Sequence, residues 1–181
     1  MPDELSGGRR ALRAPIAQVV AVVALLAAIG VAAGWIWFRL WDAPPGVVAD
    51  HAWYPDPYMS GQRADFDGIA LYVLVALAAG VLGGALCALL LARAEVVTLV
   101  AVAAGSCLAG WLMALVGTGL GPADPQVLAR TAADGTRLPG DLALTGLSPY
   151  AALPAGAIFA LMVVFLATVG GRRPAEVPRP S

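Results

Sequence analysis

Residues 69–120 read IALYVLVALAAGVLGGALCALLLARAEVVTLVAVAAGSCLAGWLMALVGTGL, and this stretch decides the fold class. It holds two uncharged apolar runs, 69–92 and 96–120, which are separated only by residues 93–95. Each run is long enough to cross a bilayer as a helix, since about 20 apolar residues suffice. The runs are continuous rather than alternating, which excludes a transmembrane β-barrel. Because the connection is so short, the two helices are predicted to form an antiparallel hairpin.

Two further apolar runs, 14–38 and 151–169, flank this hairpin. The composition agrees, because 60% of the 181 residues are hydrophobic and 13% are charged, against about 25% charged in ordinary soluble domains. In lipid the backbone must satisfy its own hydrogen bonds, so each run is predicted to be a helix. The predicted fold class is therefore all-α: a polytopic membrane protein with four transmembrane helices in an antiparallel bundle, residues 14–169. The net charge of −1 gives no indication of a nucleic-acid partner.

The distribution of arginine predicts the orientation in the membrane. Seven of the eleven basic residues, all arginines, lie in the N-terminal tail 1–13, the C-terminal tail 170–181 and the 93–95 turn. The other four lie in or next to the two long loops, 39–68 and 121–150. The positive-inside rule then places both tails in the cytoplasm and the long loops outside a plasma membrane, with the lipid bilayer as the first partner. A cleaved signal peptide is the alternative for the first run, but signal-peptide apolar regions have only about 7–15 residues.

Turn-forming residues dominate the two predicted outer loops. The first loop is rich in proline, which predicts extended or turning backbone rather than helix, with Asp65 or Asp67 as the cap of the second span. The second loop is predicted to hold a short helix that begins with Asp124 as N-cap and Pro125, and that stops at 134–135. The tail 170–181 contains three prolines and is expected to be disordered.

Small residues at four-residue spacing are the candidate helix-packing sites. Such residues let helix backbones approach closely in lipid, where apolar burial gives no driving force. Because the short turn holds the second and third spans together, the stripe on the second is predicted to meet small residues of the third. Packing within the chain is the main interpretation, and self-association through the same stripes is the alternative. The predicted packing residues are Gly30, Gly34, Ala76, Gly80, Gly84, Ala88, Gly105, Ala109 and Gly156.

No catalytic, cofactor-binding or metal-binding residue is predicted. His51 lies among aspartates in the first loop, but zinc sites use more His and Cys at closer spacing, so a solvated acidic loop is expected. Cys87 and Cys107 would lie roughly 9 Å apart along the membrane normal, counted from the helical rise. This separation exceeds the reach of a disulfide, so two free thiols are predicted.

Four short motifs give the chain a family resemblance. They are Trp41-Asp42-Ala43-Pro44-Pro45 after the first span, Asp67-Gly68 before the second, Gly121-Pro122-Ala123-Asp124-Pro125 after the third, and Leu153-Pro154 at the fourth, where family members often carry Trp-Pro. With these motifs the chain resembles, over residues 15–170, an uncharacterised actinobacterial family of four-span membrane proteins with a domain of unknown function. The resemblance implies the same topology and brings no activity with it.

The sequence favours a small non-enzymatic membrane protein, a scaffold or accessory subunit in the cell envelope. The alternative is a transporter or channel component whose path forms between protomers. A third hypothesis is an enzyme that uses the acidic outer loops. The expected partners are a membrane protein or further copies of the chain, and no cofactor is expected.

Overall fold

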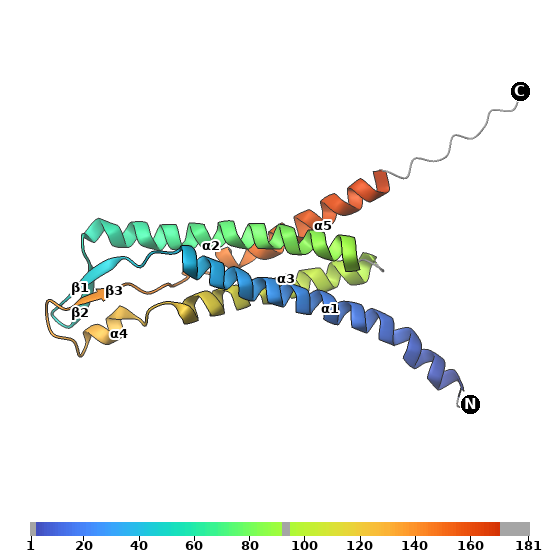
Figure 1. The fold of residues 1–181 in the computed structure, drawn as a ribbon, viewed down its shortest axis with the longest axis horizontal. Helices are drawn as coiled ribbons and strands as arrows, with labels where there is room; N and C mark the ends of the chain where they lie inside the picture. Colours follow the sequence, from blue (N-terminus) through green and yellow to red (C-terminus); the bar gives the residue numbers. More distant parts are fainter. Residues whose placement is uncertain (1–2, 92–94, 171–181) are drawn as a thin grey trace, which may run out of the picture.

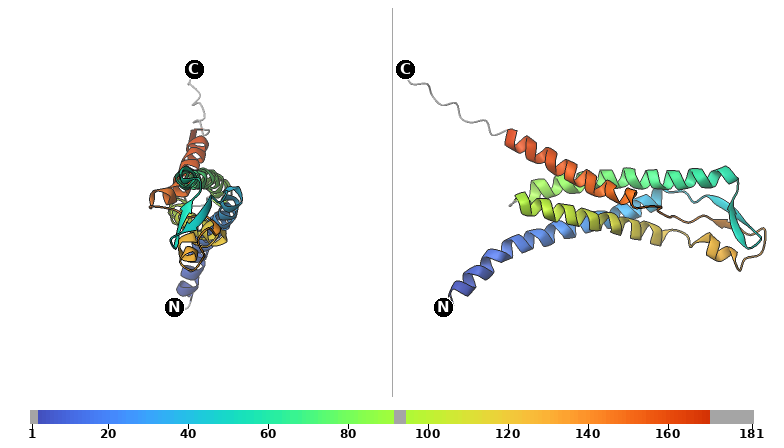
Figure 2. Two further views of the ribbon diagram at one scale, coloured as in Figure 1. Left: turned by 90° about the vertical axis from the view of Figure 1, so that its left-hand side faces the viewer. Right: turned by 180° about the vertical axis from the view of Figure 1, so that it is seen from behind.

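The structure is a computed structural model that describes residues 3–91 and 95–170. Four long helices, α1 (Asp3–Leu40), α2 (Tyr58–Leu86), α3 (Glu95–Leu120) and α5 (Ala152–Gly170), form an elongated bundle with a small cap at one end (Figure 1). All four helices contain a stretch that is long and apolar enough to cross a membrane, which agrees with the predicted polytopic all-α class. The first turns of α1 and the last turns of α5 lie at the end opposite the cap, and there the two helices diverge from the rest of the bundle (Figure 2).

Helix α1 packs closely along α3. A β-carbon at Gly30 would overlap the backbone of Ala109, and one at Gly34 would overlap the carbonyl oxygen of Met113. Gly105 of α3 faces Leu26 of α1 in the same interface. These contacts need small residues because the two backbones touch, as is usual for helices that associate in lipid.

Helix α2 packs along α5 rather than along α3. A β-carbon at Gly80 would overlap the carbonyl oxygen of Leu153, and one at Gly84 would overlap that of Ala157. From the opposite side, Gly156 faces the backbone of Leu77. The prediction that the α2 stripe meets Gly105 and Ala109 is therefore wrong. A short connection holds two helices together at one end only, and the surfaces that fit best decide the rest of the packing.

Buried polar side chains join the two helix pairs across the core. Trp37 of α1 donates a hydrogen bond from Nε1 to the carbonyl oxygen of Gly68 at 2.9 Å. Tyr72 of α2 donates from its hydroxyl to the carbonyl oxygen of Gly110 at 2.8 Å, and its ring meets Trp37 edge-on with centroids 5.0 Å apart. Within the α1–α3 pair, toward the end opposite the cap, Gln18 Nε2 donates to Thr98 Oγ1 at 2.7 Å. Such bonds satisfy groups that would otherwise be unpaired in an apolar interior.

The cap (residues 41–68 and 121–147) is an ordered unit with secondary structure that the sequence did not predict. It contains β1 (Pro45–Ala49), β2 (Ala52–Pro55) and β3 (Arg137–Pro139), which form one antiparallel sheet in the order β2-β1-β3. Val47 lies at its centre and pairs with Tyr54 on one side and Arg137 on the other. The β1–β3 pair thus joins two loops that are far apart in the sequence, whereas β1 and β2 form a local hairpin within the first loop, where turning or extended backbone was expected.

Helix α2 also begins earlier than predicted. It starts at Tyr58, so residues 58–68 are helical and stand about 16 Å into the cap, whereas an extended loop was expected. Asp65 and Asp67 lie inside this helix and are not its caps; the N-cap position is Pro57, which makes no side-chain cap hydrogen bond. The prolines of the first loop all precede Tyr58, so none of them interrupts the helix.

The short helix α4 (Pro125–Ala129) begins where the sequence predicts. The Asp124 side chain accepts a hydrogen bond from the backbone N–H of Gln126 at 2.8 Å, and Pro125 occupies the first turn. The helix ends several residues before the predicted stop at 134–135. Two other short elements complete the described part of the chain: η1, a π-helix (Cys87–Leu91), and η2, a 3-10 helix (Ser148–Ala151). Helix α1 also extends back to Asp3, through the predicted tail. The expected turn at 93–94 and the expected disorder of 171–181 lie outside the described residues.

Candidate functional site

The predicted packing residues lie in two separate interfaces and do not form a site of their own. Gly30, Gly34, Gly105 and Ala109 lie between α1 and α3, and Gly80, Gly84 and Gly156 lie between α2 and α5. Ala76 and Ala88 are buried in the common core. These positions determine how closely the helices approach, and a functional site must be sought among other residues.

Hydrogen bonds between its two loops hold the cap together. Trp53 of β2 donates from Nε1 to the carbonyl oxygen of Leu138 at 3.0 Å, and its indole lies over Gly46, where a β-carbon would overlap the ring. Gln126 of α4 forms a pair of bonds with the Trp53 backbone: Trp53 N–H donates to Oε1 at 3.2 Å, and Nε2 donates to the Trp53 carbonyl at 2.9 Å. The Gln126 side chain thereby takes the place of a neighbouring strand at the outer edge of β2.

The chain then runs from the cap back into the bundle along α3. Leu142 lies beside Gly121, where a β-carbon would be 3.1 Å from Leu142 Cβ. Tyr150 lies beside Gly110, where a β-carbon would be 3.3 Å from the Tyr150 carbonyl oxygen. Gly110 is ten residues before the end of α3, about 15 Å along the helix. Residues 142–150 therefore descend beside the last turns of α3 before α5 begins.

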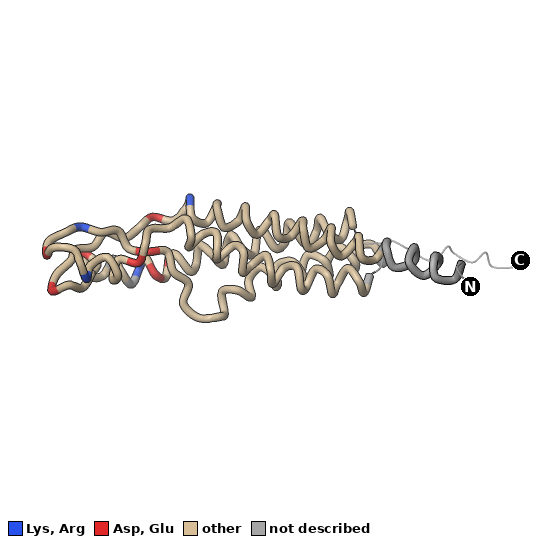
Figure 3. The backbone as a smooth tube through the Cα atoms, turned by 90° about the horizontal axis from the view of Figure 1, so that it is seen from below, with Lys and Arg blue, Asp and Glu red and all other residues tan. Residues whose placement is uncertain are grey.

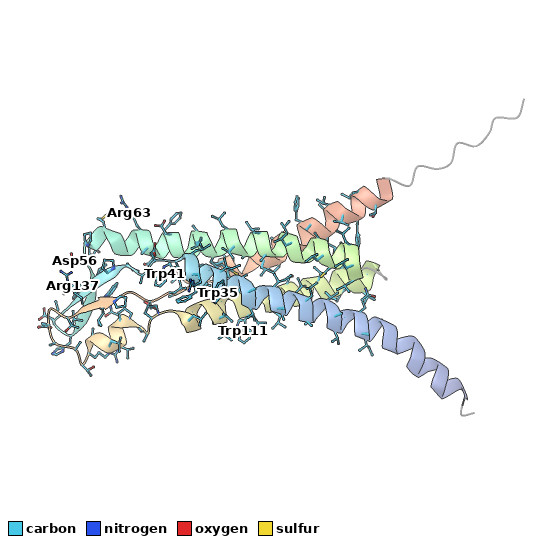
Figure 4. The ribbon with its side chains drawn as sticks, viewed as in Figure 1. Trp35, Trp41, Asp56, Arg63, Trp111 and Arg137 are labelled. Atoms are coloured by element: carbon cyan, nitrogen blue, oxygen red, sulfur yellow. The ribbon has the colours of Figure 1, made fainter. Side chains whose placement is uncertain are left out.

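A recess lies between this descending segment and α3, with a volume of about 660 Å³. Its wall on the α3 side carries Trp111, which is 54% exposed, and Leu115; Figure 4 shows Trp111 on the side of α3 that faces away from α2. Tyr150 and Leu144 form the opposite wall, and Asp124 and Asp141 lie toward the cap. The recess is therefore apolar and aromatic at the bundle and acidic at the cap.

None of the residues that line the recess, all of them described, is basic. Among the residues that Figure 3 does not draw in grey, the charged ones gather at the cap end, and the helices between the cap and the grey residues are tan. The labelled arginines Arg63 and Arg137 lie in the cap, away from Trp111 (Figure 4). The arrangement suits a molecule with an apolar part and an uncharged or cationic polar part.

The other candidate groups give no comparable site. His51 is exposed at the tip of the β1–β2 hairpin next to Asp50. Within residues 3–91 and 95–170, no group of three or more His, Cys, Asp or Glu side chains could hold a metal ion. Cys87 is buried and Cys107 is exposed, and both are free, as predicted.

Sequence reasoning missed the recess, although the sequence contains one signal for it. The fourth apolar run, 151–169, has 19 residues, fewer than the other three runs. A short last span indicates that its helix begins below the end of its neighbours, and the residues before it must then enter the bundle as irregular chain.

Comparison with family models, with curated proteins and with solved structures found no match to this chain.

Proposed function

We propose that the protein is a non-enzymatic scaffold or accessory subunit of the cell envelope. In this proposal it spans the plasma membrane four times, with both termini in the cytoplasm and the cap outside. The observation that carries it is the exposure of large apolar side chains on the cap, where water rather than lipid surrounds the chain. Tyr58 is 70% exposed and Met59 is 60% exposed, at the start of α2, and exposed Tyr54 precedes them on β2. Exposed apolar groups of this kind in water mark surfaces for protein partners.

The placement of the cap outside rests on the arginines. Seven arginines belong to the tails and the 93–95 turn of the sequence, and four belong to the loops that form the cap and its junction. An excess of arginine next to membrane spans is retained in the cytoplasm. We also propose, from the short motifs at the ends of its spans, that the chain belongs with the four-span family it resembles.

The experiment that tests the scaffold role is purification of the full chain from its native membranes in mild detergent, with a photo-reactive residue at position 58. We expect one protein partner in stoichiometric amount, cross-linked through the cap. The double variant Tyr58→Ser/Met59→Ser should lose it, because the partner's apolar contact surface is removed. The matched control is Val127→Ser/Leu128→Ser, which removes two exposed apolar side chains from α4.

Other outcomes would favour the other functions. Recovery of the chain only as a homo-oligomer that conducts a solute in vesicles would favour the transporter or channel component. Partner loss with the α4 control but not with the α2 variant would contradict the assignment of this surface. An activity that disappears on substitution of the cap aspartates would favour an enzyme.

A further inference from the structure

The backbone beside Gly110 lies at membrane depth however the bundle is positioned. The hydrocarbon core of a bilayer is about 30 Å thick, which corresponds to about 20 helical residues. Helix α3 has 26 residues, and every 20-residue stretch within Glu95–Leu120 contains Gly110. The Tyr150 carbonyl oxygen next to Gly110 is therefore within the depth of the hydrocarbon core, at its mid-plane or on the cap side of it.

The chain that leads to Tyr150 is irregular and exposed. Residues 141–145 belong to no helix, strand or hydrogen-bonded turn, and Gly146 has a φ of +80°. The stretch 145–148 is exposed, and it ends in a hydrogen bond from the Tyr150 N–H to the carbonyl oxygen of Leu147 at 3.2 Å. Irregular backbone at this depth is tolerated where it is covered by protein or lines a polar cavity, because its N–H and C=O groups need partners. Residues 141–144 and Tyr150 of this segment line the recess.

The chemistry of the lining selects the occupant. The irregular segment lines the recess at Ala143 and Leu144, where backbone N–H groups can donate, and the carboxylates of Asp124 and Asp141 accept hydrogen bonds. Hydroxyl groups supply both, whereas an ammonium group only donates. With two carboxylates and no basic side chain in its lining, the recess disfavours an anionic headgroup. Trp111 and Tyr150 add aromatic faces, on which the C–H face of a sugar ring can rest.

The place of the recess selects a lipid rather than a soluble sugar. Trp111 and Leu115 are exposed on the outside of α3, with Trp111 within the depth of the hydrocarbon core and Leu115 within it or at its cap-side boundary. An acyl chain can lie along this wall while its headgroup reaches the acidic rim. The volume of about 660 Å³ is within the range of about 300–1,000 Å³ that small-molecule sites occupy.

We propose that the recess between α3 and residues 141–150 binds a lipid of the cap-side leaflet whose headgroup is a neutral sugar, such as a monoglycosyl diacylglycerol. The hydroxyl groups of the sugar bond the rim carboxylates and the irregular backbone, and the first part of an acyl chain contacts Trp111 and Leu115. This site is independent of the protein-partner surface at Tyr58 and Met59, so either proposal can fail without the other.

The test is native mass spectrometry of the full chain. Delipidated protein is mixed with equal amounts of monoglucosyl diacylglycerol, phosphatidylethanolamine and phosphatidylglycerol of the same acyl composition. We expect the glucosyl lipid to be retained about tenfold more than phosphatidylglycerol, a difference of about 1.4 kcal/mol. Trp111→Leu and Asp141→Ala should each reduce this preference several-fold.

Matched controls separate the site from general effects on the bundle. Trp35→Leu replaces an equally exposed tryptophan, 53% against 54%, on α1 outside the recess, and Asp134→Ala removes an exposed cap carboxylate that does not line it. Both should keep the preference, and thermal melting should show that all four variants fold. Equal loss in Trp111→Leu and Trp35→Leu, equal retention of phosphatidylglycerol, stronger retention of phosphatidylethanolamine, or retention of none of the three lipids would each overturn the proposal.

Discussion

Substitution of Gly84 by leucine should destabilise the protein through the α2–α5 interface. A β-carbon at Gly84 would overlap the carbonyl oxygen and lie 2.8 Å from the carbonyl carbon and the Cα atom of Ala157, all of them backbone atoms. Backbone of a packed helix cannot rotate away as a side chain can, so α2 and α5 must separate. The separation also weakens the neighbouring contacts at Gly80 and Gly156, because dispersion energy falls steeply with distance.

The magnitude follows from the balance of two effects. Overpacking of a closely packed interior costs about 1–3 kcal/mol and occasionally more. Replacement of glycine within a helix gains up to about 1 kcal/mol. Because the clash is with backbone, we take the upper end of that cost, about 3 kcal/mol, and expect a net loss of about 2 kcal/mol. At about 2–4 °C per kcal/mol for a chain of this size, Gly84→Leu should lower the melting temperature by about 4–8 °C. The measurement is thermal unfolding in detergent, followed by circular dichroism.

Three controls make this result specific. Gly119→Leu makes the same replacement where a β-carbon would have no atom within 4 Å, and it should leave stability unchanged or slightly raised. Val81→Leu enlarges a partly exposed side chain of α2 and should be nearly neutral. Gly83→Leu should be intermediate, since it meets the ends of the flexible side chains of Leu26 and Ile29. If Gly84→Leu and Val81→Leu melt alike, the reasoning is refuted; if Gly84→Leu keeps the monomer stable but dissolves an oligomer, the stripe serves self-association.

Three further predictions concern the cap and the topology. Asp50 and His51, with φ of 49° and 58°, form the two-residue turn of the β1–β2 hairpin, where Asn-Gly is preferred, so Asp50→Asn/His51→Gly should stabilise the cap by about 1 kcal/mol in urea unfolding; a loss of stability would contradict this turn geometry. Gln126→Ala removes both hydrogen bonds to the Trp53 backbone and should cost about 1 kcal/mol, with faster amide exchange confined to β2 and α4; unchanged exchange there would show that the pair does not hold the cap. A reporter fused after Ser181 that works only in the cytoplasm should be active, and an active export-dependent reporter at the same place would contradict the orientation.

The sequence by itself determined the membrane class and the number of long helices. Continuous runs of 19–25 apolar residues must be helical in lipid, because each backbone N–H and C=O group must form its hydrogen bond within its own segment. The start of α4 was also predictable from the sequence, because Asp124 caps the helix and Pro125 occupies its first turn. In both cases the cause is local, and a local cause is visible in the sequence.

Only the tertiary structure decided which helices pair and how the two loops combine. The stripe with Gly80 and Gly84 is compatible with any neighbour that carries small residues, and competition among all four helices selects α5. Strand β1 takes partners from both loops, so its pairing depends on residues about 90 positions away. The recess exists because α5 begins beside Gly110 rather than at the end of α3, which follows from the fit of Gly156 against α2. Each of these features depends on contacts between segments that are distant in the sequence. The residue pattern of one segment does not show how favourable its contacts with each possible partner segment are.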